Sequence, residues 1–580
     1  MRKLAPFSYR PLFFSGLLLL VACGENLDNT ASGYTSVAMT CNPVRYSLID
    51  SSTAGSSNTD ASKTDSSTDP LREQQWHLAN ADSTIKQGIN LPESLWSSIT
   101  GQGVNIAIVD TSIDYNHPDL QENLDLQNSC QFGDTPTGGH GTAVAGLIGA
   151  IKDNGQGITG VAPGSTILGF NTLDLPDEQI TTATWATSLS ATNSRNAAID
   201  VFNLSFGFQP KSTPVDFDVN LNGITQEGVE LGRGGLGALY FKAAGNYFID
   251  TACDVSDSDY YITDLPCQSA TLDPDNNIAY MMVVAALSAD GARAHYSSSG
   301  SSILFSAPGG GNGNNDSNVS SASRNSIGSV GLVTTKDIDL AVPSTDPKLM
   351  DIPGYAGYTR NFTGTSAATP IATGVAALIL QANPSLGWRD VRDILIRTAD
   401  IVDASIHTVN IGSLIVEPAW QTNGAGLSYH NWYGFGRINA NAAVNRAIDH
   451  INLPTQIVKT VSDTTSGSIP NDIAQPFRHY FSAPTGMSTV ESVQLKLNIS
   501  HPYPADLMVQ LTSPSGTDSV MLTPRNALSG EIEGYEFTLL SQAFYGENSA
   551  GDWILTVYDT DNDEYAAGAV HDWSATFYGY

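Results

Sequence analysis

The chain has 580 residues, of which 41% are hydrophobic, and its 58 acidic against 26 basic residues give a formal net charge of −32. This length predicts two to four domains, and this apolar content is enough for sizeable cores. The acidic balance argues against nucleic-acid binding, which needs a basic footprint. We interpret most of these charges as a solvated acidic surface.

The first residues have the pattern of an export signal. A basic start precedes an apolar stretch, Leu12 to Ala22, that is too short for a membrane span. The stretch ends Leu-Val-Ala-Cys, which resembles a bacterial lipoprotein box. We therefore expect residues 1–22 to be a lipoprotein signal peptide and Cys23 to be lipidated. Gly24, in place of Asp, indicates an exported outer-membrane lipoprotein, on the periplasmic or the surface face. The alternative is an ordinary secretory signal with a chance cysteine.

Residues 23–68 are rich in Ser, Thr and Asp, a composition typical of a tether. From residue 69 to about 450, apolar β-branched runs alternate with helical patterns, which predicts a doubly wound parallel α/β domain. The expected strands are 104–109, 200–205, 238–243 and 280–286, and the expected helices are 140–151, 367–382 and 388–398. Segment 309–328 is low in core residues and is expected to be a surface loop.

After a break near 454–475, four segments alternate apolar and polar residues with a period of two: VESVQLKLNIS, ADLMVQLTS, WILTVYD and WSATFYG. This period is typical of half-buried strands. The C-terminal part is therefore predicted to be an antiparallel β-sandwich.

Three polar residues stand where an α/β sheet forms its sites, at the carboxyl ends of strands and the starts of helices. Asp110 ends the apolar run 106–109, which suits a buried parallel strand. His140 lies in GGHGTAVAGLIGAI, where small residues allow a helix to pack closely. Asn246 ends LYFKAAGN, and its side-chain amide could donate a hydrogen bond to an oxyanion.

Ser366, in GTSAATP, stands at the start of an apolar helix, where N–H groups and the positive end of the helix dipole face a forming charge. A serine hydroxyl is a weak nucleophile unless a base takes its proton. Each of these residues alone is most often a helix cap or a structural residue. Together, the order Asp–His–Ser with a separate Asn is the subtilisin order of the catalytic triad.

These motifs resemble the subtilisin-like serine proteases and, within them, the kexin/furin proprotein-convertase branch. TDPLREQQWHLAN resembles the start of that catalytic domain, and NWYGFGRINANAAV its closing segment. Two later segments resemble the C-terminal P domain of that branch: HPYPADLMVQLTSPSGT and GENSAGDWILTVYDT. The resemblance covers about residues 69–580, and it implies a catalytic domain over 69–450 and a P domain over 451–580. It also implies that Asp110, His140 and Ser366 form the triad and that Asn246 is the oxyanion donor.

The resemblance further implies a structural Ca²⁺ site made only of oxygen ligands, as calcium prefers. The matching positions are the side chains of Asp69, Asp119 and Asn154 and the carbonyls of Ile151, Gln156 and Ile158. The alternative is a simple Asx turn at residues 153–155.

Substrate binding is expected at Ser205, Phe206 and Gly207, which resemble the family's edge that pairs with the substrate backbone. Asp273 matches one acid of the family's specificity pocket, and a carboxylate there could hold an Arg or Lys at the substrate's P1 position. Thr111 stands where furin has a further acid. Strict dibasic cleavage is therefore not predicted.

If Cys23 is lipidated, four cysteines remain, and in an exported chain they allow three disulfide connectivities or free thiols. Cys253 and Cys267 are close in sequence and are expected to pair, which leaves Cys41 with Cys130. No Cys/His spacing suggests zinc.

The sequence therefore predicts an exported, membrane-anchored serine endopeptidase that acts on protein or peptide substrates, with a preference for a basic P1 residue as its finer expectation. The competing hypothesis is a non-catalytic, lipid-anchored surface binding or adhesion protein, which a P domain, a tether and an anchor would also suit. A degraded triad or a missing oxyanion donor would support it, and the sequence has neither.

Overall fold

The computed structural model describes residues 41–42, 68–79, 87–133, 139–209, 212–249, 264–311, 331–337, 352–561 and 567–580. All of them belong to one unit, Met39–Tyr580. The expected signal peptide, Cys23, Cys253 and most of the expected loop 309–328 lie outside the described residues.

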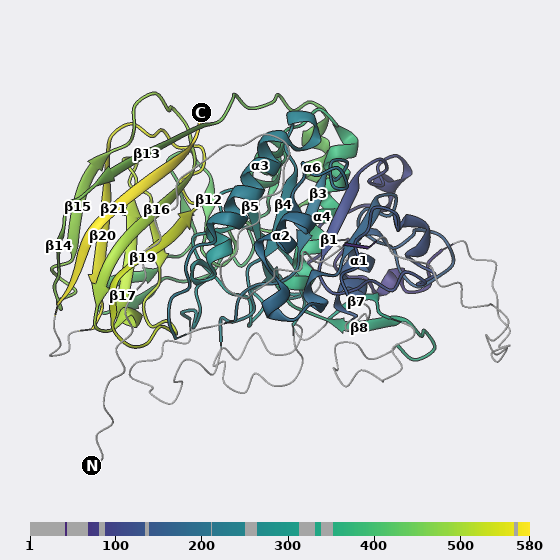
Figure 1. Ribbon diagram of the computed structural model, residues 1–580, viewed down its shortest axis with the longest axis horizontal. Coiled ribbons are helices and arrows are strands. Elements are labelled where there is room, and N and C mark those ends of the chain that lie inside the picture. Colours follow the sequence, from purple (N-terminus) through teal and green to yellow (C-terminus); the bar gives the residue numbers. More distant parts are fainter. Residues whose placement is uncertain are drawn as a thin grey trace, which may run out of the picture. The chain divides into compact units, whose positions relative to one another are not determined.

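A parallel sheet forms the centre of the N-terminal part (Figure 1). Its six strands are β1 (Asn105–Val109), β2 (Thr166–Phe170), β3 (Val201–Leu204), β4 (Leu239–Ala243), β5 (Met281–Leu287) and β6 (Ile303–Pro308). They lie in the order β2-β1-β3-β4-β5-β6, and every pair is parallel. The strand order reverses between β1 and β3, and in such sheets ligands bind at the carboxyl ends beside this reversal. Asp110 follows β1 there, and Ser205 follows β3.

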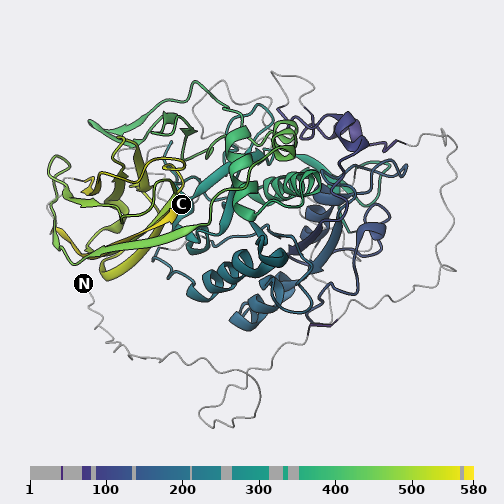
Figure 2. The ribbon, with the colours of Figure 1, turned by 90° about the horizontal axis from the view of Figure 1, so that it is seen from above.

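Helices cover both faces of this sheet. They are α1 (His140–Gly149), α2 (Thr182–Leu189), α3 (Val219–Gly235), α4 (Thr365–Ala382), α5 (Trp388–Thr398) and α6 (Ala440–Ile448). Helix α4 packs on β3 to β6 and against α1 and α6, whereas α2 and α3 pack together and α3 contacts β4. In Figure 2 the blue helices α2 and α3 lie on one side of the sheet and the green α4 on the other. The predicted doubly wound fold is confirmed, with each expected strand and helix within two residues of its expected bounds.

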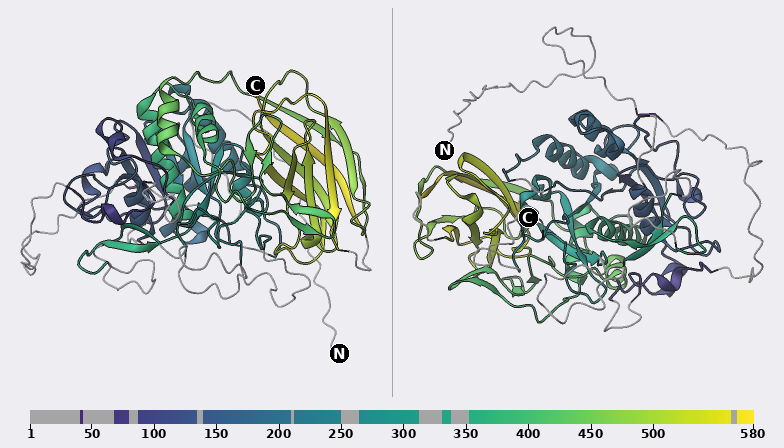
Figure 3. Two further views of the ribbon diagram at one scale, coloured as in Figure 1. Left: turned by 180° about the vertical axis from the view of Figure 1, so that it is seen from behind. Right: turned by 90° about the horizontal axis from the view of Figure 1, so that it is seen from below.

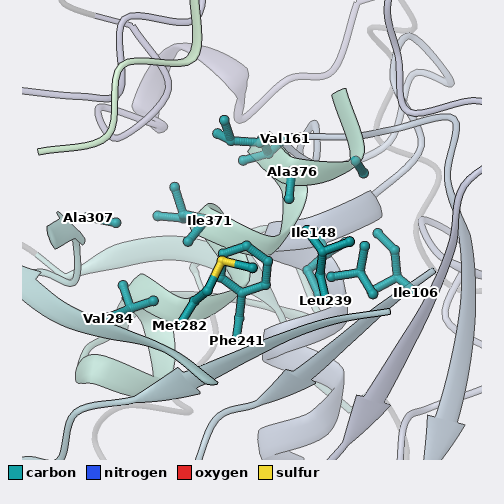
Figure 4. Close-up of a cluster of buried hydrophobic side chains, with 14 of the residues drawn as sticks. Ile106, Ile148, Val161, Leu239, Phe241, Met282, Val284, Ala307, Ile371 and Ala376 are labelled. Carbon is teal, nitrogen blue, oxygen red and sulfur yellow. The ribbon is translucent and has the colours of Figure 1, made fainter. Parts of the chain in front are cut away.

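Helix α4 is the central core element. Among the described residues it is the one helix long and apolar enough to cross a membrane, but 83% of it is buried inside the protein. Its Ile371 and Ala376 pack in one cluster with Ile106, Phe241 and Met282 of the strands (Figure 4). This burial holds the N-terminal end of α4, with Ser366, rigidly above the sheet.

Pairs of short antiparallel strands, which the sequence patterns did not predict, complete this part. They are β7 (Leu332–Thr335) with β8 (Tyr358–Phe362), β9 (Val409–Ile411) with β10 (Leu414–Glu417), and β11 (Gln421–Thr422) with β12 (Ser428–Tyr429). Two 3₁₀ helices, η6 (Ala270–Leu272) and η7 (Pro274–Asn277), precede β5.

The C-terminal part is a sandwich of two antiparallel sheets, as predicted. Its strands are β13 (Ile457–Asp463), β14 (Gly467–Ile469), β15 (Phe477–Ser482), β16 (Val490–His501), β17 (Leu507–Thr512), β18 (Asp518–Leu522), β19 (Ile532–Ser541), β20 (Asp552–Asp559) and β21 (Gly568–Gly579). One sheet has the order β13-β21-β16-β19, with β14 also paired to β21, and the other β15-β20-β17-β18. Their apolar faces share one core. Figure 3 shows these green-to-yellow strands grouped with no α-helix among them.

A buried polar interface joins the sandwich to helix α5. The Arg389 guanidinium donates from Nε to both carboxylate oxygens of Glu491, at 2.9 and 3.0 Å, and these residues are 8% and 1% exposed. The Tyr545 hydroxyl donates to Asp393 (3.0 Å). A second contact reaches η7, because Gln494 donates to the Asn277 carbonyl (2.7 Å). Both ends of the interface therefore depend on specific hydrogen bonds.

A disulfide joins Cys41 to Cys130, 89 residues apart. Beside it, Asn42 and Gln131 exchange backbone hydrogen bonds of 3.2 and 2.9 Å. Cys267 is also disulfide-bonded, while Cys253, its expected partner, lies outside the described residues. Part of the segment 23–68 is thus fixed to the domain rather than being a tether throughout.

Candidate active site

Asp110 and His140 form a hydrogen-bonded pair at the carboxyl end of β1. The Nδ1 of His140 lies 2.7 Å from Oδ1 of the fully buried Asp110, whose Oδ1 also accepts the Thr111 N–H at 2.7 Å. With Nδ1–H held by a carboxylate, the other ring nitrogen, Nε2, is the one left to act as a base. Phe362 packs edge-to-face with the imidazole, with ring centroids 5.4 Å apart.

Helix α1 can bring His140 to Asp110 because residue 141 is a glycine. A Cβ on Gly141 would lie 2.3 Å from the Thr111 carbonyl oxygen, closer than any real contact. The Thr111 hydroxyl instead accepts the Gly141 N–H (2.9 Å), so it satisfies one of the free donors at the start of the helix. Thr111, which stands where furin has an acid, is therefore a helix-capping residue here.

Ser366 lies in the first turn of α4 and faces the end of β3. Its hydroxyl donates to the Ser205 carbonyl (2.8 Å), and the Ser205 hydroxyl donates back to the Ser366 carbonyl (3.0 Å). Two further buried hydrogen bonds extend this network. Thr373 of α4 donates to the Asn203 carboxamide oxygen, and the Asn203 amide donates to the Ser205 hydroxyl, both at 2.9 Å. This network fixes Ser366 against β3, and it directs the serine hydroxyl toward Ser205.

Asn246 turns its amide group toward the same place. Its Oδ1 accepts the backbone N–H of Thr365 (2.8 Å) and the Thr365 hydroxyl (3.0 Å), which leaves Nδ2 on the other side. Gly364 has a φ of +126°, a conformation that favours glycine. A Cβ there would lie 3.4 Å from Asn246 Nδ2, 3.6 Å from Asn246 Oδ1 and 3.5 Å from the Ser366 nitrogen. The Asn246 amide and the Ser366 nitrogen therefore border the same space beside Gly364.

Tyr296 holds the turn before Ser366. Its hydroxyl accepts the Gly364 N–H (2.8 Å) and lies 2.8 and 2.6 Å from the carbonyl oxygens of Gly309 and Gly310. Burial raises the pKa of this phenol, which is therefore neutral and can donate. Sequence reasoning missed Tyr296, because no local pattern connects it to Gly364, which lies 68 positions later in the chain.

Asp69 and Asp119, two of the expected calcium ligands, meet around Asn154. The Asn154 backbone N–H donates to Asp69 (3.2 Å), and its side-chain amide donates to Asp119 (2.9 Å). Asp119 also accepts the Ile158 N–H (3.0 Å). Both carboxyl groups are buried, at 5% and 0% exposure, and burial raises their pKa values, that of Asp119 to about 6.

The chemistry of these groups fits a calcium ion. Two buried carboxyl groups and the backbone carbonyls of segment 151–158 can supply the oxygen atoms that Ca²⁺ prefers. The Asn154 amide directs its nitrogen to Asp119, and its oxygen accepts the Gln156 N–H (2.8 Å). The described residues contain no cluster of three or more His, Cys, Asp or Glu side chains suited to a metal ion. The fit therefore depends on carbonyl ligands, among them the expected Ile151, Gln156 and Ile158.

The expected substrate-binding segment leaves β3 beside Ser366. Ser205 is buried, Phe206 stacks on Trp185 with ring centroids 5.4 Å apart, and Gly207 is exposed. Asp273 lies under this segment and accepts the Phe208 N–H (3.1 Å). The Asp273 carboxylate, predicted to bind a basic P1 residue, forms a buried ion pair with Lys242 (2.8 Å).

These residues lie on a subtilisin-type fold, and comparison with known proteins gives the family. The subtilase family model matches residues 101–436, and the proprotein convertase P-domain model matches residues 490–577. The chain belongs to the subtilase family and carries a P domain. It is a serine endopeptidase, so the enzyme prediction is confirmed.

Its relatives are bacterial and animal proteases. The Aeromonas extracellular serine protease of Aeromonas sobria is 33% identical over 548 residues, which cover 85% of this chain and 84% of that protein. Furin-1 of Xenopus laevis is 29% identical and covers 86% of this chain, which spans 57% of furin-1. The crystal structure of the serine protease of Aeromonas sobria aligns with a TM-score of 0.76 at 28% identity, over 93% of this chain and all of that one.

Proposed function

We propose that this subtilase hydrolyses peptide bonds through Asp110, His140 and Ser366, with Asn246 and the Ser366 N–H as the oxyanion donors. The observation that carries the proposal is that the Asn246 amide and the Ser366 nitrogen border the same space beside Gly364. An oxyanion needs two such preorganised donors. The neighbouring Asp110–His140 pair supplies an oriented base.

The reaction begins with a rotation of the Ser366 side chain. Its hydroxyl leaves the Ser205 carbonyl and turns to His140, which takes the proton as Oγ attacks the substrate carbonyl. The charge that forms on the carbonyl oxygen is held by Asn246 and the Ser366 N–H. His140 then gives its proton to the leaving amine, while Asp110 stabilises the imidazolium. Water attacks the acyl-enzyme by the same steps in reverse.

The substrate backbone is proposed to pair with segment 205–207, which leaves the end of β3 beside the nucleophile. The same geometry does not support the expected preference for a basic P1 residue. Asp273 was the carboxylate assigned to it, and Lys242 already neutralises this group. We therefore propose an endopeptidase for protein or peptide substrates without a basic requirement at P1.

Calcium is proposed to bind Asp69, Asp119 and Asn154 with the carbonyls of Ile151, Gln156 and Ile158. It would neutralise two buried carboxylates and so favour the folded state. Asp119 follows the segment that carries Asp110, and Asn154 follows α1, which carries His140. These residues therefore connect both catalytic segments to the entry of the domain at Asp69.

Export and anchoring complete the proposal. We propose domain limits of 69–450 and 451–580, with residues 1–22 as the signal peptide and Cys23 as the lipidated residue. Metabolic labelling with a fatty-acid analogue tests the anchor. The parent should be labelled and the Cys23→Ser variant should not, and equal labelling would count against a lipoprotein.

Activity is tested with Ser366→Ala. This variant should lose peptide hydrolysis and labelling by a fluorophosphonate while keeping its melting temperature. A matched control is Ser385→Ala, which removes an exposed hydroxyl and should leave activity unchanged. Turnover by Ser366→Ala at the parent rate would refute the assignment.

A further inference from the structure

A fully buried lysine lies under the substrate segment, and the proposed reaction does not use it. Lys242 lies within β4 and is 0% exposed, so its side chain does not reach solvent. Its ammonium donates to Asp273 Oδ2 (2.8 Å), to Asn276 Oδ1 (3.0 Å) and to the Ala243 carbonyl (3.3 Å). All three ammonium hydrogens therefore have oxygen acceptors, as a buried charge requires.

This cluster connects two segments that flank Ser366. On one side, Asp273 Oδ2 accepts the Phe208 N–H, three residues after Ser205. On the other side, Lys242 and Asn276 donate to the carbonyls of Ala243 and Ala244 (3.3 and 3.1 Å), just before Asn246. The ion pair therefore lies buried beneath both segments, with Lys242 0% and Asp273 2% exposed.

The ammonium lies close to the substrate segment. A Cβ on Gly207 would be 2.9 Å from Asp273 Oδ2 and 3.5 Å from Lys242 Nζ. A guanidinium or ammonium from a substrate would need the same carboxylate oxygen that Lys242 holds. It would also be repelled by Lys242 at short range, and an unfavourable charge of this kind is an effective means of rejecting a ligand.

Asp275, the neighbouring acid, does not give the cluster a net negative charge. Asp275 is 4% exposed, and its Oδ1 has no hydrogen-bond partner among the described residues. Burial and the charge of Asp273 raise the pKa of Asp275, which favours its neutral form. Asp218, at the start of α3, and Lys242 are the other charged groups near it. With Asp273 and Lys242 paired, the cluster as a whole is close to neutral.

We propose that Lys242 is a specificity-determining residue: it serves as a built-in counter-ion for Asp273 and makes the enzyme select a neutral P1 side chain over Arg or Lys. This inference rests on the proposed function, because it assumes that the P1 side chain enters between segments 205–208 and 243–246. Removing the ammonium should leave Asp273 without its counter-ion and so create a site for a basic P1 residue.

The test uses the full chain and peptides that differ only at P1, with Gln, Leu, Lys or Arg. In the parent, kcat/KM should be at least about tenfold higher for Gln or Leu than for Arg. Lys242→Met should raise the Arg-to-Gln ratio at least about tenfold. The double variant Lys242→Met/Asp273→Asn, which lacks both charges, should return the ratio to the parent value.

A second variant keeps the test decisive if Lys242→Met does not fold. Lys242→Gln retains a donor for Asp273 but no charge, and it should shift the ratio in the same direction. A parent that prefers Arg, or a folded neutral variant whose Arg-to-Gln ratio does not rise above that of the parent, would overturn the role of Lys242.

Fluorophosphonate labelling separates this outcome from failure of the proposed function. If the parent is labelled and hydrolyses peptides while Ser366→Ala does neither, the catalytic assignment stands whatever the P1 ratio shows. If the parent is neither labelled nor active on any of the peptides, the proposed function itself fails, and with it this inference.

Discussion

The orientation of the Asn246 amide makes a quantitative prediction. Asn246 has one observed and one proposed function, and different substitutions separate them: Oδ1 accepts two hydrogen bonds from Thr365, and Nδ2 is the proposed oxyanion donor. Asn246→Ala removes both. It should lower kcat about 10²–10³-fold, the effect of losing one of two oxyanion donors, and destabilise the fold by ~1–3 kcal/mol, because two buried donors of Thr365 lose their acceptor.

Asn246→Asp isolates the catalytic part. An aspartate keeps the acceptor for Thr365 but replaces the donor with a carboxylate oxygen, which repels the oxyanion. This variant should retain the parent's melting temperature and lose at least as much kcat as the alanine variant, with a small change in KM. Thr365→Val, which removes one of the two bonds that orient the amide, should cost less than about tenfold.

The assay is steady-state hydrolysis of one fluorogenic peptide, with the concentration of active sites measured by fluorophosphonate titration so that misfolded protein is not counted. Melting temperature is measured on the same samples. A kcat within a factor of ten of the parent in Asn246→Asp, or a loss confined to KM, would refute the oxyanion role of Asn246.

Three further outcomes are expected. Chelation of calcium should lower the melting temperature of the parent, because an ion at a hundredfold excess over its Kd stabilises the folded state by about 2.7 kcal/mol. The melting temperature of Asp119→Asn should not change on chelation. Equal shifts in both proteins would show that the ion binds elsewhere. Burial raises the pKa of Glu417 to about 8, so the folded state holds a proton that the unfolded state releases near pH 4–5, and stability should fall as pH rises toward 8. Thermal unfolding across pH 5–8.5 should show a flatter profile for Glu417→Gln, and identical profiles would contradict this. Glu491→Ala leaves Arg389 as an uncompensated buried charge and should cost ~3–5 kcal/mol in urea unfolding, whereas a loss below 1 kcal/mol would show that the interface does not depend on this pair.

The sequence predicted the elements whose signal is local. Strands such as β1 and β4 are continuous apolar runs because parallel strands are buried on both faces. Asp110, His140, Asn246 and Ser366 each follow or begin such an element, so their positions at one end of the sheet could be inferred. The sandwich could be predicted because apolar and polar residues alternate along its strands with a period of two.

What the sequence did not predict depends on contacts between distant segments. Nothing in LYFKAAGN indicates that Lys242 pairs with Asp273, 31 residues later, instead of facing solvent. The bond from Ser366 to Ser205 and the support from Tyr296 likewise join parts of the chain that have no common pattern. The pairs of short antiparallel strands were missed because strands of two to five residues carry too little periodicity.

The Cys41–Cys130 disulfide changes what a cut in the N-terminal segment would do. Residues 43–67 connect Cys41 to the domain at one end, and the disulfide connects Cys41 to the same domain through Cys130. A single cleavage between residues 43 and 67, by this protease or another, would therefore leave the N-terminal piece covalently attached. The separated piece would appear on a gel only after reduction. An enzyme anchored through Cys23 would be shed only by cleavage before Cys41, or by cleavage after it together with reduction of the disulfide.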